Sequence, residues 1–113
     1  MRESALQPGV LAGISGGDAT FERELLALFI RATERDAVLL EVAVQERARE
    51  RTEAIAHLVQ GRCKTIGATA VARGAERVEH AAAHADWRAI IGAHLEFATA
   101  LAALRDEVDG RFG

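Results

Sequence analysis

The sequence predicts an all-α fold, an antiparallel four-helix bundle with a short extra N-terminal helix, and three observations support this prediction. Half of the 113 residues are hydrophobic but only 4% are aromatic, so the core must consist mainly of aliphatic side chains and alanine, which favour helices. The only proline, Pro8, lies near the start, and few glycines interrupt the chain after Asp18. Apolar residues recur at three- and four-residue steps, the period of one helix face.

The N-terminal part of the chain predicts a short helix followed by a long one. Pro8 is suited to a first helical position, so the short helix is expected to run to Ile14 and to end at Ser15, Gly16 and Gly17. Asp18 is expected to cap the long helix. The buried stripe of that helix is predicted to contain Phe21, Leu25, Leu28, Phe29, Ala32, Leu39 and Val42.

The charged segment 45–53 is either a turn or the exposed middle of a continuous helix, and the pattern leaves both open. Apolar periodicity then resumes along a stripe formed by Ile55, Val59, Cys63 and Ile66. Gly67 is expected to end this helix. The next stripe is made of small residues: Val71, Gly74, Ala75, Val78 and Ala82.

The last predicted helix begins after a turn in which Asp86 is the N-cap. Its apolar stripe follows a regular three-four spacing through Trp87, Ile90, His94, Phe97, Leu101, Leu104 and Val108. We therefore expect one domain, the bundle over residues 18–109, with a helix and turn at 1–17 packing on it and a frayed tail at 110–113.

Composition and charge exclude several classes of partner. A formal net charge of -3 with interspersed signs argues against a nucleic-acid-binding surface. No apolar stretch approaches the roughly 20 residues needed to span a bilayer. The single cysteine, Cys63, forms no internal disulfide and belongs to a core stripe, so we expect a cytoplasmic, monomeric protein without a redox thiol.

The helix around His57 has an unusual exposed face. At about 100° per residue, His57 falls opposite the apolar stripe, and Gly61, Lys64 and Ala68 are predicted to follow on the same side. A solvated face usually carries large polar side chains, and an interior glycine costs about 1 kcal/mol of helix stability relative to alanine. An open approach to the imidazole would explain Gly61, although a solvated histidine beside a tolerated glycine would also produce this pattern.

The run from His57 to Ala68 resembles the motif of histidine-containing phosphotransfer (HPt) domains. In that motif an aliphatic residue follows the phosphorylated histidine. After it come a position that is usually lysine, a glycine, two small residues and, further along, a hydrophobic residue followed by Gly-Ala. The positions that fit are His57, Val59, Gly61, Cys63, Ile66, Gly67 and Ala68. The similarity extends to segments 16–18, 25–29 and 75–79, and so covers most of the chain.

The chain departs from this motif at two positions. Gln60 stands where the family usually has lysine, and it brings a hydrogen-bond donor but no positive charge to a phosphoryl oxygen. Lys64, on the same predicted face, is a candidate to supply that charge. Arg62 replaces a small residue and is expected to extend outward toward an acidic partner.

The resemblance implies that His57 is phosphorylated and that Glu79, on the following helix, accepts a hydrogen bond from Nδ1 and orients the ring. It also implies that receiver domains of response regulators are partners, together with a sensor or hybrid histidine kinase, and that the receiver supplies the Asp, Mg²⁺ and Lys of the reaction. The chain shows no phosphate-binding loop or acidic metal cluster, so we expect a phosphocarrier without a cofactor of its own rather than an autonomous enzyme. Leu58 and the segment 10–14 are candidates for an apolar docking rim.

Two other functions would fit parts of the sequence. A metal site is conceivable at His80 and His84, which lie four residues apart with Glu76 one turn earlier, but no second ligand pair occurs at matching spacing. His94 lies in an apolar stripe and is expected to be a hydrogen-bonded core or boundary residue. A helical adaptor bundle without phosphochemistry would explain the alanine-rich stripes but not the face shared by His57 and Gly61.

Overall fold

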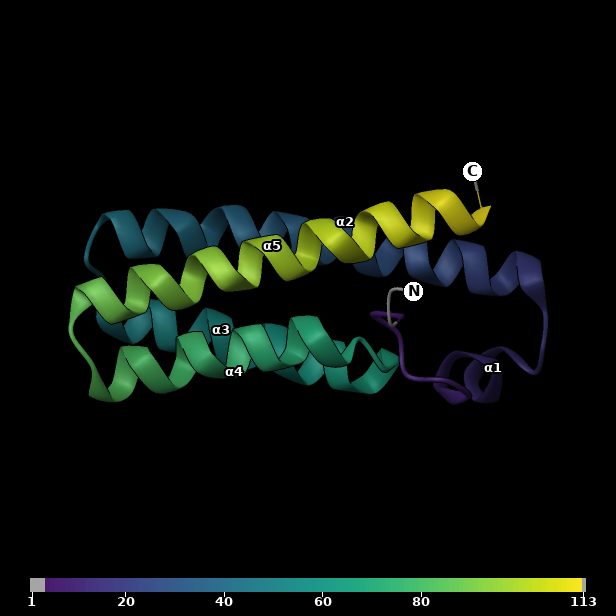
Figure 1. Cartoon of the computed structure of the whole chain (residues 1–113), viewed down its shortest axis with the longest axis horizontal. Helices are drawn as coiled ribbons and strands as arrows, with labels where there is room; N and C mark the ends of the chain where they lie inside the picture. The colour runs from purple at the N-terminus through teal and green to yellow at the C-terminus, as the bar shows by residue number, and fades with distance from the viewer. Residues whose placement is uncertain (1–3, 113) are drawn as a thin grey trace.

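The computed structural model describes residues 4–112, and it shows an all-α bundle, as predicted. A short helix, α1 (Val10–Ser15), precedes four long helices: α2 (Ala19–Gln45), α3 (Arg49–Ile66), α4 (Thr69–His84) and α5 (Trp87–Phe112). Helices α2 and α5 run side by side, and α3 and α4 form the other half of the bundle (Figure 1). No helix in the described part of the chain is long and apolar enough to cross a membrane.

The sequence signals for helix ends are largely confirmed. Asp18 accepts a hydrogen bond from the backbone N–H of Phe21, and Asp86 accepts one from Ala89. Gly67 ends α3 with a left-handed φ of 79°, which glycine adopts without a steric penalty. The charged segment contains a turn, since α2 ends at Gln45 and α3 begins at Arg49.

Both ends of the predicted helical region need correction. Helix α1 begins at Val10 rather than at Pro8, because Gly9 has a φ of 86° and so interrupts any helix that starts before it. At the other end, α5 continues through Phe112, so Gly110 and Arg111 are helical and do not belong to a frayed tail. Residue 113 lies outside the described residues.

The predicted core stripe of α2 is wrong for most of its members. Phe21, Leu28, Leu39 and Val42 are exposed, and of the predicted set only Phe29 is buried. The buried face is rotated by about 100°, the angle of one residue, from the predicted stripe. It consists of Glu22, Leu26, Phe29, Ile30, Thr33, Leu40, Ala43 and Val44. Two polar residues, Glu22 and Thr33, occupy core positions and so concealed this face in the apolar pattern.

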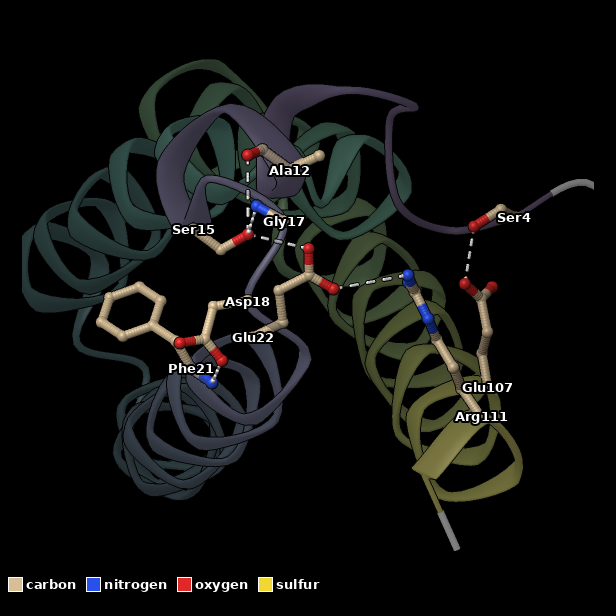
Figure 2. A network of polar contacts seen from close by, with 9 residues as sticks. All are labelled: Ser4, Ala12, Ser15, Gly17, Asp18, Phe21, Glu22, Glu107 and Arg111. Atoms are coloured by element: carbon tan, nitrogen blue, oxygen red, sulfur yellow. Dashed lines mark hydrogen bonds and ion pairs between the residues drawn. The ribbon is translucent and has the colours of Figure 1, made fainter.

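Glu22 is buried because it joins three segments of the chain. Its carboxylate accepts a hydrogen bond from the Ser15 hydroxyl at 2.9 Å and faces the Arg111 guanidinium at 3.7 Å (Figure 2). Close by, Glu107 on α5 accepts hydrogen bonds from the Ser4 hydroxyl and the Ala5 backbone N–H. These contacts fasten residues 4–17 to the ends of α2 and α5.

The core stripes of the other helices agree with the predicted patterns. Val59, Cys63 and Ile66 of α3 are buried, while Ile55 is half-buried and Ala56 beside it is buried. The predicted α4 stripe is buried at every position: Val71, Gly74, Ala75, Val78 and Ala82. In α5 the buried members are Ile90, Phe97, Leu101, Leu104 and Val108, whereas Trp87 and His94 are half-buried. The site described below lies on α3 and α4, whose small core residues allow the two helices to approach closely.

Burial makes Cys63 a sensitive probe of this packing. Its side chain is fully buried, and burial raises the pKa of the thiol to about 12, so almost no thiolate exists in the folded protein at pH 8. We expect the native chain to react with a thiol reagent only as fast as it opens, and to react at once in denaturant. Rapid stoichiometric labelling of the native chain, monitored by absorbance, would contradict this packing.

Candidate functional site

His57 lies in the middle of α3 and points away from the core. Its side chain is 70% exposed, as expected from its position opposite the stripe that contains Val59 and Cys63. The predicted face is therefore confirmed at the histidine, which is open to a macromolecular partner.

Glu79 of α4 lies directly beside this histidine. Its Oε2 is 2.8 Å from Nδ1 of His57, and its side chain is only 26% exposed. A carboxylate only accepts hydrogen bonds, so Nδ1 is the donor, and in the neutral ring Nε2 then keeps its lone pair. The pair thus presents an oriented imidazole with a nucleophilic nitrogen facing away from Glu79.

Gly61 lies one helical turn after His57, and the surface around it is open. A Cβ placed at this position would meet no other atom within 4 Å, apart from the backbone of its own helix and its chain neighbours. Close packing therefore does not explain the glycine, in contrast to Gly74 on α4. The approach to His57 from this side is free of side-chain bulk.

The remaining predicted site residues are less close to the histidine. Gln60 is half-buried and lines a groove between α3 and α4 that also contains Glu79. Lys64 is exposed one turn further along α3. No hydrogen bond or ion pair joins either residue to His57 in the described part of the chain.

Two expectations about this face were wrong. Ala68 is fully buried instead of exposed, because α3 ends at Ile66 and the left-handed Gly67 turns the chain toward α4. Arg62 does not extend outward: its side chain is half-buried, its Nη1 is buried, and Nη1 lies 2.7 Å from Asp36 of α2 in the same chain. Arg62 therefore ties α3 to α2.

Arg73 is a basic residue near the site that the sequence reasoning missed. It lines the groove that contains Gln60 and Glu79, and it also borders a second hollow that includes Lys64. Arg73 thus lies between the groove, which Arg77 also lines, and the hollow that contains Lys64. A helical wheel of α4 would have shown Arg73 as exposed, but only the packing of α4 against α3 brings it near Lys64.

The predicted apolar rim is only partly present. Leu58 and Ile14 are exposed, whereas Leu11 is buried in the core. Val10 packs against the turn at Gly67, where an added Cβ would lie 3.0 Å from the Val10 side chain. Of the candidates, Leu58 is the apolar residue immediately next to His57.

No family model, curated protein or solved structure matches this chain. The function must therefore be argued from the geometry of the site and from the resemblance of the motif.

The other histidines form no comparable arrangement. His80 and His84 share one face of α4, with ring centroids 4.7 Å apart. Within residues 4–112, no three side chains of His, Cys, Asp or Glu are grouped so that they would hold a metal ion. His94 lies at the core boundary, as expected, but its buried Nδ1 has no hydrogen-bond partner there, and burial lowers the pKa of the ring.

Proposed function

We propose that this protein is a phosphorelay carrier of the HPt type, which accepts a phosphoryl group on Nε2 of His57 from the phospho-aspartate of a receiver domain and passes it to another response regulator. The observation that carries this proposal is the exposed His57 ring, oriented by Glu79 beside the open surface at Gly61. The motif from His57 to Ala68 supports it independently of these contacts.

The proposed step needs only one bond change at phosphorus. The Nε2 lone pair forms a P–N bond while the P–O bond of the aspartyl phosphate breaks, and its electron pair returns to the aspartate carboxylate. The ring then bears a positive charge and keeps its proton on Nδ1. Glu79 stabilises that charge through the hydrogen bond it already makes, as a carboxylate does for histidine in other enzymes.

The partner supplies the rest of the chemistry in this proposal. The receiver domain provides the aspartyl phosphate, Mg²⁺ and a lysine, while this chain contributes the nucleophile, with Gln60 and Lys64 near the incoming phosphoryl group. A sensor or hybrid histidine kinase would load the receiver, so the carrier is placed in the cytoplasm. Leu58 is the apolar contact next to His57 in the docked complex.

A transfer assay tests this proposal directly. A panel of receiver domains, each phosphorylated with radiolabelled acetyl phosphate and then freed of it, is mixed with the full chain. We expect at least one receiver to label the chain with an acid-labile, alkali-stable phosphate, which peptide mapping places on His57. A label on another residue, or no transfer from any receiver of a broad panel, would refute the carrier function.

Replacing Glu79 by Ala is expected to slow transfer by about tenfold, since the ring loses the group that fixes its orientation and stabilises its charge. Glu79→Gln separates these effects, because its amide oxygen still accepts the hydrogen bond without a negative charge. Glu76→Ala, one turn earlier on α4, is the matched control and should transfer normally. The ring ¹⁵N chemical shifts of His57, which report whether Nδ1 or Nε2 carries the proton, should also change in Glu79→Ala; unaltered shifts together with an unaltered rate would remove Glu79 from the site.

Replacing Gly61 by Gln is expected to change stability and transfer in opposite directions. The free energy of unfolding should rise by about 1 kcal/mol, because glycine is a poor helix former and the added side chain meets no neighbour. Transfer should slow, because the longer side chain obstructs the approach to His57. Gly61→Ala supplies the same helix propensity with little bulk, and equal transfer rates in the two variants would show that access plays no part.

A further inference from the structure

Helix α2 carries a second apolar stripe that the bundle leaves largely exposed, although Leu25 packs partly against the core. It consists of positions spaced alternately four and three residues apart, namely Phe21, Leu25, Leu28, Ala32, Arg35, Leu39 and Val42, and is called the α2 seam below. Six of these seven residues are apolar. A strict alternation of this kind is the heptad pattern by which one helix packs along another in a coiled coil.

The seam is open to solvent in the structure. The exposed fraction is 45% for Phe21, 62% for Leu28, 52% for Leu39 and 41% for Val42, while Leu25 and Ala32 are half-buried. Leu26, Ile30 and Leu40, on a different face of α2, supply its contacts with the core. Helix α2 therefore has two apolar faces, and only one of them is covered within the described bundle.

The spacing indicates a helical partner. Apolar residues that repeat every 3.5 positions remain aligned with a neighbouring helix that coils around them, whereas a globular core is satisfied by a broader stripe of period 3.6. The seam extends over 22 positions, so it presents such a partner with several consecutive turns.

The charges near the seam point to a second copy of this chain, in antiparallel orientation. Arg35 is the only charged member of the seam. Glu24, eleven positions before Arg35, is exposed at the edge of the seam, next to Leu25. In the described residues neither side chain has an ion-pair partner. A parallel pair of α2 helices would place Arg35 against Arg35, which is unfavourable.

An antiparallel pair centred on Ile30 packs Leu28 against Ala32 and Leu39 against Phe21 of the second copy. In the same register Arg35 lies opposite Leu25 and one position from Glu24 of the other copy, so symmetry produces two Arg35–Glu24 pairs. Charge and apolar complementarity are thus satisfied by one arrangement.

We propose that the α2 seam is a homodimer interface, in which α2 of a second copy packs antiparallel against it, in place of the monomer expected from composition. Helix α3 contacts α2 through Arg62 and Asp36, and it contacts α4 through His57 and Glu79. The ion pair and the hydrogen bond that hold α3 against its two neighbours thus use none of the seam residues.

Sedimentation equilibrium of the full chain over a wide concentration range tests this proposal. We expect a reversible monomer–dimer equilibrium that the double variant Leu28→Glu, Leu39→Glu weakens by about a hundredfold or more, since the charges would be buried in an apolar contact. Far-UV circular dichroism should show the same helicity, because both leucines are exposed. Leu95→Glu, a matched control on α5 with 61% exposure, should dimerise normally.

The charges test the orientation. Arg35→Glu and Glu24→Arg should each weaken the dimer, and the two together should restore it; dimers unaffected by the single changes would overturn the antiparallel register. A wild-type chain that is monomeric at every concentration overturns the interface. If the wild-type chain is monomeric and the double variant Leu28→Glu, Leu39→Glu loses phosphoryl transfer, the seam binds the receiver instead of a second copy. That result overturns the homodimer but leaves the carrier function standing.

Discussion

Replacing His57 by Gln is expected to abolish phosphoryl labelling of the chain completely while leaving its free energy of unfolding within about 0.5 kcal/mol of the original value. The label disappears because the variant lacks the imidazole whose Nε2 is the proposed nucleophile. Stability is preserved because the ring is 70% exposed and makes its single side-chain hydrogen bond to Glu79 at the bundle surface. Radiolabel transfer and urea denaturation measure the two quantities on the same preparation.

The chain provides matched controls for this result. His80 and His84 are also exposed and lie on a helix next to α3, but no carboxylate among residues 4–112 forms a hydrogen bond with their rings. His80→Gln and His84→Gln should therefore accept phosphate at the original rate. Label that persists in His57→Gln, or that vanishes in His84→Gln instead, would transfer the function to another histidine.

Helix ends and the small-residue stripes could be predicted from the sequence because their causes are local. Asp18 and Asp86 cap the N–H groups three residues away, and Gly67 has a backbone conformation that other residues avoid. The buried face of α4 was predicted because all of its members are small or aliphatic. These features depend on neighbours within one or two helical turns.

The core face of α2 could not be predicted because distant partners determine it. Glu22 is buried only because Ser15 and Arg111 bind its carboxylate, and Arg111 comes from the far end of the chain. Without those partners Glu22 appears to be a surface residue. The stripe that was predicted has real apolar periodicity, but the bundle leaves it exposed, which is why it is available to a second molecule.

The candidate site also combines features that follow from local sequence with features that depend on how distant helices pack. The positions of His57 and Gly61 follow from helical periodicity alone and agree with the structure. The closeness of Glu79 depends on how α4 packs against α3, which no local pattern shows, and only the family resemblance suggested it. Ala68 was misplaced because periodicity was extended beyond the residue at which α3 ends.

Replacing Gly74 by Val is expected to lower the free energy of unfolding by about 3 kcal/mol, the upper part of the range for overpacked cores. A Cβ at this position would lie 3.0 Å from Cα and 3.3 Å from Cβ of Phe97, so it would strike the backbone of α5 rather than a movable side-chain end. Helices α4 and α5 would have to separate around Phe97, which is fully buried. Thermal denaturation should show a fall of roughly 10 °C in Tm for a chain of this size.

Gly92→Val separates the packing contact from helix propensity. Gly92 lies inside α5 and a Cβ there meets nothing within 4 Å, so the same substitution changes only propensity, which slightly favours valine over glycine. The difference between the two variants therefore measures the close approach of α4 to α5. Equal stabilities would mean that α5 moves away from Gly74 without cost, and the packing that holds Glu79 on α4 beside His57 would then be looser than the structure indicates.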